Sequence, residues 1–184
     1  MQQREVLTIP ARRYGPYTPL LMFGSGAAEE RGARVHTTTW QRMDELKAIP
    51  FEKWGPWAHA QVATVLDDLA PAQPMLIAKS LGTHAARLAA ERNLPAVWLT
   101  PLLTDDALVS GLKAANAPFM LIGGTEDTFW DGRVARALTP HVLEIEGANH
   151  GMYVPGPLAR SAAVLGQVVT AVEEFLDAVV WPTR

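Results

Sequence analysis

Short apolar runs alternate along the chain with longer segments in which apolar residues recur at helical spacing. The runs predict strands at residues 6–9, 20–23, 33–39, 75–78, 96–99, 119–122 and 142–145. Several runs are apolar at successive positions, as expected of strands that helices cover on both faces. The periodic segments predict helices at residues 57–69, 81–92, 105–115, 131–138 and 158–180. This alternation indicates an α/β fold, a three-layer α/β/α sandwich around a mostly parallel sheet of about six or seven strands.

Composition narrows the class of protein further. The chain has 184 residues and no repeat or linker that would divide it, which predicts one domain over residues 1–184. A net charge of −3 provides no basic face for nucleic acid, and the lack of cysteine excludes disulfides, thiolate metal sites and a cysteine nucleophile. No apolar run approaches the roughly 18 residues that span a bilayer, and the N-terminal residues lack a signal-peptide core. We therefore expect a cytoplasmic protein that binds neither nucleic acid nor membranes.

The first candidate for chemistry is Ser80, which lies between a predicted strand and a predicted helix. A sharp strand-to-helix turn exposes its middle side chain and requires small residues two positions away on either side. Ala78 and Gly82 meet that requirement. The backbone N–H of Leu81 would then point at a developing oxyanion. The alternative is that Ser80 only caps the helix.

Two further candidates follow later strands. Asp127 comes after a glycine-rich turn, where its carboxylate could orient a histidine or could cap the helix predicted from residue 131. His150 is the one histidine of five in a small-residue loop that leaves the carboxyl end of a strand. His84 falls one helical turn after Ser80 and is interpreted as a residue on the helix face. Ligands of open parallel sheets bind at the carboxyl ends of the strands, where Asp127 and His150 are expected.

The order Ser80, Asp127, His150, each after a separate strand, is that of one of the common catalytic triads. On these motifs the sequence resembles the α/β-hydrolase superfamily over nearly its whole length. Asp105 and Asp106 follow the strand at residues 96–99 and are rival candidates for the acid. They come after a proline and are more simply explained as the start of a helix.

The resemblance implies further features of the site. Superfamily members carry a short glycine turn after the strand that residues 20–23 would form, and by that match the backbone N–H of Ser25 is a second oxyanion donor beside Leu81. Lys79 fills the variable position before the nucleophile and is interpreted as a solvated or ion-paired surface lysine rather than a substrate contact. Only residues 100–117 are available where many members insert a lid domain, so we expect a shallow, open site.

The substrate side of the site is less constrained by the sequence. The aromatic residues of segment 40–56 either roof the site or plug the edge of the core. Trp130 is predicted as a pocket wall, and Trp54, Leu102 and Met152 are weaker candidates.

The function that these residues imply is hydrolysis of an ester or thioester of a small or carrier-tethered acyl substrate, without a metal or an organic cofactor. The alternatives are a tailoring enzyme on the same scaffold, as a cyclase, lyase or acyl transferase, and a catalytically silent binding module. The sequence does not determine the oligomeric state.

Overall fold

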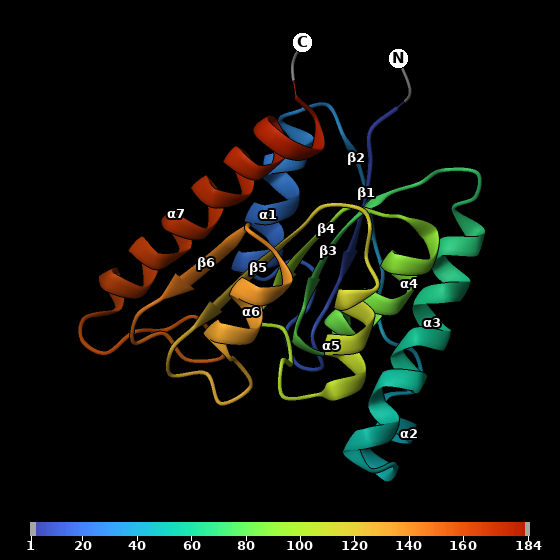
Figure 1. Cartoon of the computed structure of the whole chain (residues 1–184), viewed down its shortest axis with the longest axis horizontal. Helices are drawn as coiled ribbons and strands as arrows, with labels where there is room; N and C mark the ends of the chain where they lie inside the picture. Colours follow the sequence, from blue (N-terminus) through green and yellow to red (C-terminus); the bar gives the residue numbers. More distant parts are fainter. Residues whose placement is uncertain (1–2, 183–184) are drawn as a thin grey trace.

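A six-stranded, fully parallel sheet forms the centre of the computed structural model, which describes residues 3–182 (Figure 1). The strand order is β2-β1-β3-β4-β5-β6. The strands are β1 (Glu5–Ile9), β2 (Arg34–Thr37), β3 (Met75–Lys79), β4 (Ala96–Leu99), β5 (Phe119–Gly124) and β6 (Val142–Ile145). The sheet confirms the α/β sandwich that the alternating pattern predicts.

Helices cover both faces of this sheet. They are α1 (Pro19–Glu29), α2 (Met43–Ala48), α3 (Trp54–Asp68), α4 (Ala86–Arg92), α5 (Asp106–Lys113), α6 (Gly132–Leu138) and α7 (Leu158–Phe175). Shorter helical turns are η1 (Phe51–Lys53), η2 (Ser80–Ala85) and η3 (Leu176–Val180). Helices α1 and α7 pack on one face of the sheet, whereas α3, α4, α5 and α6 pack on the other (Figure 1). In the described part of the chain, no helix has the length and apolar character needed to cross a bilayer.

Alternating side chains of the central strands build two separate cores. On β3, Met75 and Ile77 face α1 and α7, and Leu76 and Ala78 face the opposite helical layer. All four side chains are at most 2% exposed. Complete burial of a large apolar side chain contributes about 1.5–3 kcal/mol, so strands buried on both faces are strongly stabilised. This explains why the chain is apolar at successive positions there.

The strand predicted at residues 20–23 is wrong, because this segment is the beginning of α1. Buried positions recur at Leu20, Leu21 and Gly24, while Met22 and Phe23 are 44% and 46% exposed. That spacing is helical, and Pro19 favours a helix start at this point. A four-residue apolar run by itself does not distinguish a strand from a half-buried helix.

Four residues with left-handed backbone conformations lie in the segments that follow parallel strands. Ser80 after β3 and Thr100 after β4 have φ values of +50° and +44°. In the loop after β6, Gly147 and Met152 have φ values of +73° and +62°. Left-handed conformations are uncommon for residues other than glycine and are concentrated at functional sites. The carboxyl edge of the sheet is therefore the place to look for chemistry.

Candidate active site

Ser80 lies on a strained turn between β3 and η2. Its left-handed φ of +50° ends the strand abruptly and starts the helical turn at once. Gly82 is required because a Cβ there would lie 2.8 Å from the carbonyl oxygen of Ile9 and 3.0 Å from that of Pro10. The backbone that leaves β1 thus passes directly beside the turn. The N–H of Leu81 belongs to the first helical turn, where backbone donors have no partner within the helix.

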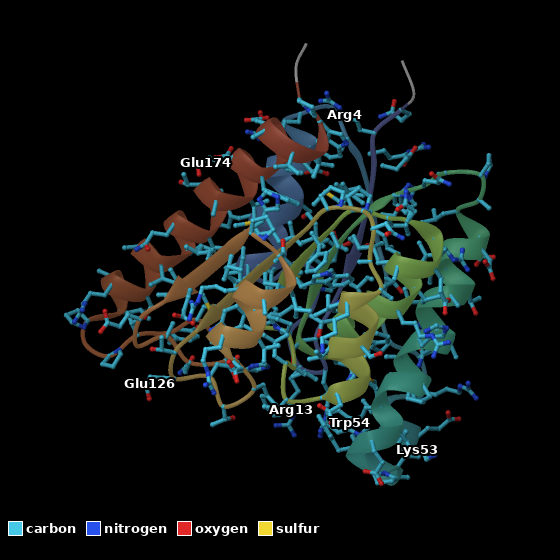
Figure 2. The ribbon with its side chains drawn as sticks, in the orientation of Figure 1. Arg4, Arg13, Lys53, Trp54, Glu126 and Glu174 are labelled. Carbon is cyan, nitrogen blue, oxygen red and sulfur yellow. The ribbon has the colours of Figure 1, made fainter. Side chains whose placement is uncertain are left out.

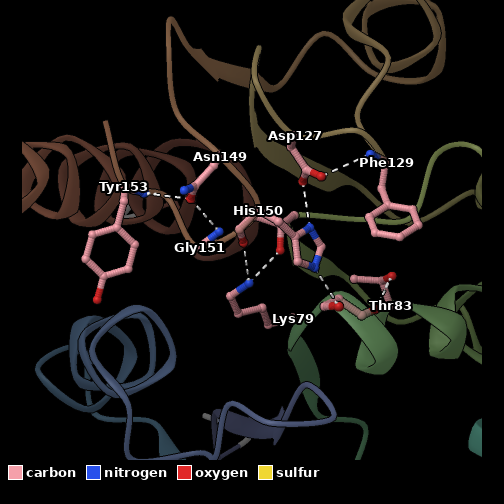
Figure 3. A network of polar contacts seen from close by, with 10 residues as sticks. Lys79, Thr83, Asp127, Phe129, Asn149, His150, Gly151 and Tyr153 are labelled. Carbon is pink, nitrogen blue, oxygen red and sulfur yellow. Dashed lines mark hydrogen bonds and ion pairs between the residues drawn. The ribbon is translucent and has the colours of Figure 1, made fainter. Parts of the chain in front are cut away.

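Ser80, His150 and Asp127 form a continuous chain of hydrogen bonds (Figure 3). The Nε2 atom of His150 lies 2.8 Å from Oγ of Ser80, and Nδ1 lies 2.7 Å from Oδ2 of Asp127. The other carboxylate oxygen of Asp127 accepts the N–H of Phe129 at 3.0 Å. The Asp127 side chain is 0% exposed, whereas that of His150 is 35% exposed. The arrangement provides a hydroxyl, a base within reach of its proton, and a buried carboxylate that orients the base.

The loops that carry Asp127 and His150 are tied to each other by backbone contacts. The N–H of Glu126 donates to the carbonyl of Ala148 at 3.0 Å, and the N–H of Gly147 donates to Oγ1 of Thr125 at 2.8 Å. Gly124 lies so close to Ala148 that a Cβ at this position would overlap its carbonyl group. The glycines around these loops therefore let two neighbouring strand ends approach closely enough for the carboxylate to reach the imidazole.

The rival carboxylates have other roles in the structure. Asp105 caps α5 by accepting the N–H of Ala107 at 2.9 Å and that of Leu108 at 3.4 Å. Its second oxygen lies 3.6 Å from Nδ1 of His84, a buried histidine on η2. Asp106 is the exposed first residue of α5. The carboxylate beside His150 is Asp127.

Lys79 is buried, contrary to its interpretation as a surface lysine. It is 2% exposed, and its Nζ donates to Oγ1 of Thr100 at 2.8 Å and to the carbonyl oxygen of His150 at 2.9 Å. The ring of Tyr14 lies 5.1 Å from the same ammonium. Burial lowers the pKa of Lys79 to about 8, against a smaller opposing effect of the nearby Asp127 carboxylate. Sequence patterning did not indicate this buried cation.

Ser25 is not placed to donate to an oxyanion. It lies inside α1, where a backbone N–H points along the helix axis toward the carbonyl four residues earlier. Its hydroxyl donates to the carbonyl of Leu21 at 2.8 Å. The expectation required a turn after a strand at residues 20–23, and that strand is absent. The turn that borders η2 is instead the one after β1, beside Gly82.

Trp130, the predicted pocket wall, packs away from the triad. Its Nε1 donates to Oε2 of Glu144 at 2.7 Å, and its ring covers Gly123, where a Cβ would overlap it. Leu102 is 3% exposed and belongs to the core on the α3 side of the sheet. The neighbour of Trp130, Phe129, contacts the imidazole instead, a residue that the sequence analysis missed.

A row of aromatic side chains leads outward from the triad. The ring of Phe129 lies edge-on to His150 at a centroid distance of 5.3 Å, and Phe51 stacks on Phe129 at 6.3 Å. Trp54 lies 5.2 Å from Phe51, and the guanidinium of Arg12 lies 5.1 Å from the Trp54 ring centroid. Figure 2 labels Trp54 and Arg13, the residue after Arg12, at the end of the molecule where the strands finish.

The segment 40–56 divides between the two roles that its aromatic residues suggested. Phe51 stacks on Phe129 beside His150 and is 39% exposed, whereas Trp54 contacts Phe51 and also packs against a small core around Leu46. Trp40 packs 5.4 Å from Trp57, around the buried side chain of Leu46, in a small core behind η2.

Met152 lines a small cavity on the other side of the His150 loop. This cavity has a volume of about 220 Å³ and lies between the beginnings of α1 and α7. Its walls include Tyr14, Leu20, Tyr153 and Leu165. The cavity is mainly apolar and borders the loop two residues after the candidate base.

Residues 3–182 hold no group of three histidine, aspartate or glutamate side chains close enough to bind a metal ion. That the reaction needs no metal or cofactor stays a prediction, which depends on the proposed roles of Ser80, Asp127 and His150.

Solved structures with the same fold extend over nearly the whole chain. Est1E from Butyrivibrio proteoclasticus, with ferulic acid bound, superposes with a TM-score of 0.70 at 12% identity, covering 98% of this chain and 91% of its own. Dienelactone hydrolase from Anabaena variabilis superposes with a TM-score of 0.67 at 20% identity, covering 96% of this chain and 87% of its own. Alpha/beta hydrolase domain-containing protein 10 from mouse superposes with a TM-score of 0.65 at 13% identity, covering 96% of this chain and 92% of its own.

No family model and no curated protein matches this sequence. Structural likeness at such low identities establishes the fold alone. The chain has the α/β-hydrolase fold, as the resemblance of its motifs predicts.

Proposed function

We propose that this protein is a serine hydrolase that cleaves an ester or thioester of a small or carrier-tethered acyl substrate. The observation that carries the proposal is the unbroken hydrogen-bond chain from Asp127 through His150 to Ser80. The left-handed conformation of Ser80 supports it, because such a strained turn presents the hydroxyl away from the sheet.

In the proposed reaction, Nε2 of His150 takes the proton of Ser80 as its Oγ attacks the substrate carbonyl carbon. Asp127 accepts the Nδ1–H of His150 and stabilises the imidazolium that forms. The tetrahedral intermediate collapses to an acyl-enzyme as His150 returns the proton to the leaving alcohol or thiol. A water molecule, deprotonated by His150, then attacks the acyl carbonyl, and the free acid departs from regenerated Ser80.

For the oxyanion we propose the backbone N–H groups of Leu81 and Arg12. Leu81 follows the nucleophile directly and opens η2. The segment after β1 packs against Gly82, but Pro10 has no N–H and that of Ala11 donates to the carbonyl of Tyr14 at 3.0 Å. Arg12 is the next residue in this segment. One such donor is worth about 3–4 kcal/mol of transition-state stabilisation.

The aromatic row suggests the class of acyl or leaving group. Phe129 beside His150, followed outward by Phe51 and Trp54, offers flat apolar surface that suits aromatic or alkyl groups. The ferulic acid bound to Est1E, a protein of the same fold, is an aromatic acid of this kind. The guanidinium of Arg12 at the outer end of the row would attract an anionic carrier, which keeps thioesters among the substrates.

Hydrolysis is favoured over cyclisation, lyase chemistry or acyl transfer by the access of water. The His150 side chain is 35% exposed, so bulk water reaches the base that would activate it. A transferase has to exclude that water from its acyl-enzyme. A silent binding module would not need the complete hydroxyl–imidazole–carboxylate chain. We further propose a cytoplasmic location, with which the absence of cysteine is compatible.

The test is labelling with a fluorophosphonate probe, followed by a chain-length screen of p-nitrophenyl esters and acyl-CoA thioesters. We expect the probe to label the wild-type protein at Ser80 and not the Ser80→Ala variant. Arg12→Gln should raise KM for acyl-CoA and leave KM for a neutral p-nitrophenyl ester nearly unchanged. Absence of labelling, with no turnover of any ester or thioester, would contradict a serine hydrolase.

A further inference from the structure

The buried ammonium of Lys79 is a feature that the triad mechanism does not use. We propose that Lys79 is a positioning residue, which holds the backbone of His150 so that its imidazole stays against Ser80. This inference rests on the proposed function of the triad.

The geometry links two consecutive residues of one strand end to the same histidine (Figure 3). Nζ of Lys79 lies 2.9 Å from the carbonyl oxygen of His150, and Oγ of Ser80 lies 2.8 Å from its Nε2. The strand that carries the nucleophile therefore holds the base at both its backbone and its ring. A shift of the His150 backbone would change the distance on which proton transfer depends.

The loop around His150 has little regular structure of its own to define that distance. It runs from the end of β6 at Ile145 to the start of α7 at Leu158. Asn149 organises it locally, with its Oδ1 accepting the N–H groups of Gly151 and Tyr153 at 2.9 Å and 3.2 Å. These bonds lie within the loop. Ala148 and Gly147 bond to the loop after β5, and the Lys79 bond is the contact that joins the backbone of His150 itself to the end of β3.

Burial of Lys79 is difficult to explain as a stabilising device. Removing an ammonium from water carries a penalty that a well-packed apolar side chain would avoid. Four groups from separate elements face it: Thr100 after β4, Tyr14 after β1, Asp127 after β5 and His150 after β6. No carboxylate forms a direct ion pair with it among the described residues. Charges kept at such a cost are expected where they serve a site.

The bond is also of the stronger kind. A hydrogen bond from an ionised donor to a carbonyl is stronger than one between neutral groups. Loss of the proton from Lys79 would weaken it without removing the side chain. Because burial lowers the pKa of Lys79 to about 8, that loss falls within a pH range where the protein can be assayed.

The experiment compares Lys79→Met with Thr100→Val in the full-length protein. Lys79→Met keeps an unbranched side chain of similar size but removes the donor, whereas Thr100→Val removes the other hydrogen-bond partner of the ammonium and leaves its bond to His150. With a p-nitrophenyl ester, we expect Lys79→Met to lower kcat by about 10- to 100-fold, with KM changed by less than about twofold. Thr100→Val should lower kcat by less than about threefold. The urea midpoint of Lys79→Met at pH 7 should equal or exceed that of the wild type.

A pH profile provides a readout that a purely structural role would not move. Wild-type kcat should decrease as the pH rises through about 8, because the ammonium loses its charge. The Lys79→Met profile should lack this alkaline decrease. If Lys79→Met does not fold, Lys79→Gln, which keeps a shorter neutral donor, and the wild-type profile provide the same comparison.

The outcomes separate the two proposals. Probe labelling of wild type and Lys79→Met at equal rates, with equal kcat, would contradict the positioning role while supporting the serine hydrolase. A lower urea midpoint with unchanged kcat would assign Lys79 to stability only. If the wild type neither reacts with the probe nor hydrolyses any ester, the proposed function fails, and the positioning role fails with it.

Discussion

Two histidine–aspartate pairs lie at the same edge of the sheet and differ in almost every respect that matters for catalysis. In the first, Nδ1 of His150 lies 2.7 Å from a carboxylate oxygen of Asp127. In the second, Nδ1 of His84 lies 3.6 Å from Asp105. The His150 side chain is 35% exposed, whereas that of His84 is 3% exposed. From the sequence alone, each of the two histidines could be placed near Ser80 and near an aspartate.

The second nitrogen of each ring separates the pairs more sharply. Nε2 of His150 lies 2.8 Å from the Ser80 hydroxyl. Nε2 of His84 is buried and has no hydrogen-bond partner in the described structure. Asp105 is also committed to the end of α5, since its Oδ1 accepts two backbone N–H groups. A catalytic pair requires a carboxylate that is free to hold the ring and a nucleophile on the other side of it.

The largest expected effect is the loss of the Ser80 hydroxyl, which only the first pair has beside its imidazole and which we propose as the nucleophile. Ser80→Ala should lower ester hydrolysis by about 10³-fold or more and leave the unfolding midpoint nearly unchanged, because only a hydroxyl is removed. Steady-state kinetics with a p-nitrophenyl ester measures it. Ser110→Ala, which removes an exposed hydroxyl on α5, is the matched control and should behave as wild type. Substantial activity in Ser80→Ala would mean that another residue is the nucleophile.

Asp127→Asn should lower kcat by about 10²–10⁴-fold with little change in KM. An amide can present the wrong group to Nδ1, and it does not stabilise the imidazolium. The same ester assay measures this effect. Near-normal kcat in Asp127→Asn would show that the 2.7 Å contact between Asp127 and His150 does not contribute to catalysis.

The corresponding change in the second pair should have little effect on the reaction. Asp105→Asn and Asp106→Asn should each change kcat by less than about threefold, because Asp105 caps α5 and Asp106 lies in its first turn. Asp105→Ala should lower the free energy of unfolding by about 1 kcal/mol, since alanine cannot cap. Urea unfolding and the ester assay measure both. A collapse of activity in an Asp105 variant would reverse the assignment of the two pairs.

The smallest effect concerns the pH dependence of stability. Burial lowers the pKa of His84 from its ordinary value of 6.5, so below that pH the unfolded chain binds a proton that the folded chain resists. The free energy of unfolding of the wild type should therefore decrease relative to His84→Gln as the pH falls below 6.5, and the difference should be constant above it. Urea unfolding from about pH 5 to about pH 8 tests this. A constant difference throughout would contradict a buried, neutral His84.

The linear pattern of the chain predicts the sheet well because burial on both faces leaves a direct signature. Strands β3, β4 and β5 are buried at every position, and each coincides with a predicted apolar run. Residues 20–23 carry a run of the same kind and form a helix instead. Packing of this segment against the sheet and α7 decides between the two, since it buries Leu21 and leaves Phe23 exposed.

In the candidate site, too, the sequence could place some residues and not others. Ser80, Asp127 and His150 could be proposed from the sequence because each follows a strand, and parallel strands bring their carboxyl ends to one edge. The assignment of the Ser25 N–H as an oxyanion donor depended on a strand at residues 20–23. Because these residues form a helix, that assignment is wrong. The sequence offers two adjacent aromatic residues, Phe129 and Trp130, as contacts of the site. Which of the two rings faces His150 depends on the path of the chain after Asp127, and in the structure it is Phe129.

The amino-acid sequence by itself determined the α/β alternation, the order of hydroxyl, carboxylate and imidazole, and the small residues that let their loops approach. These are local properties: periodicity, composition of turns and position relative to a strand. Only the tertiary structure decided that Lys79 is buried against His150, that Asp105 serves a helix and that Phe129 faces the triad. Each of these depends on contacts between segments far apart in the chain, and the same side chain in another packing would be solvated, unpaired or turned away.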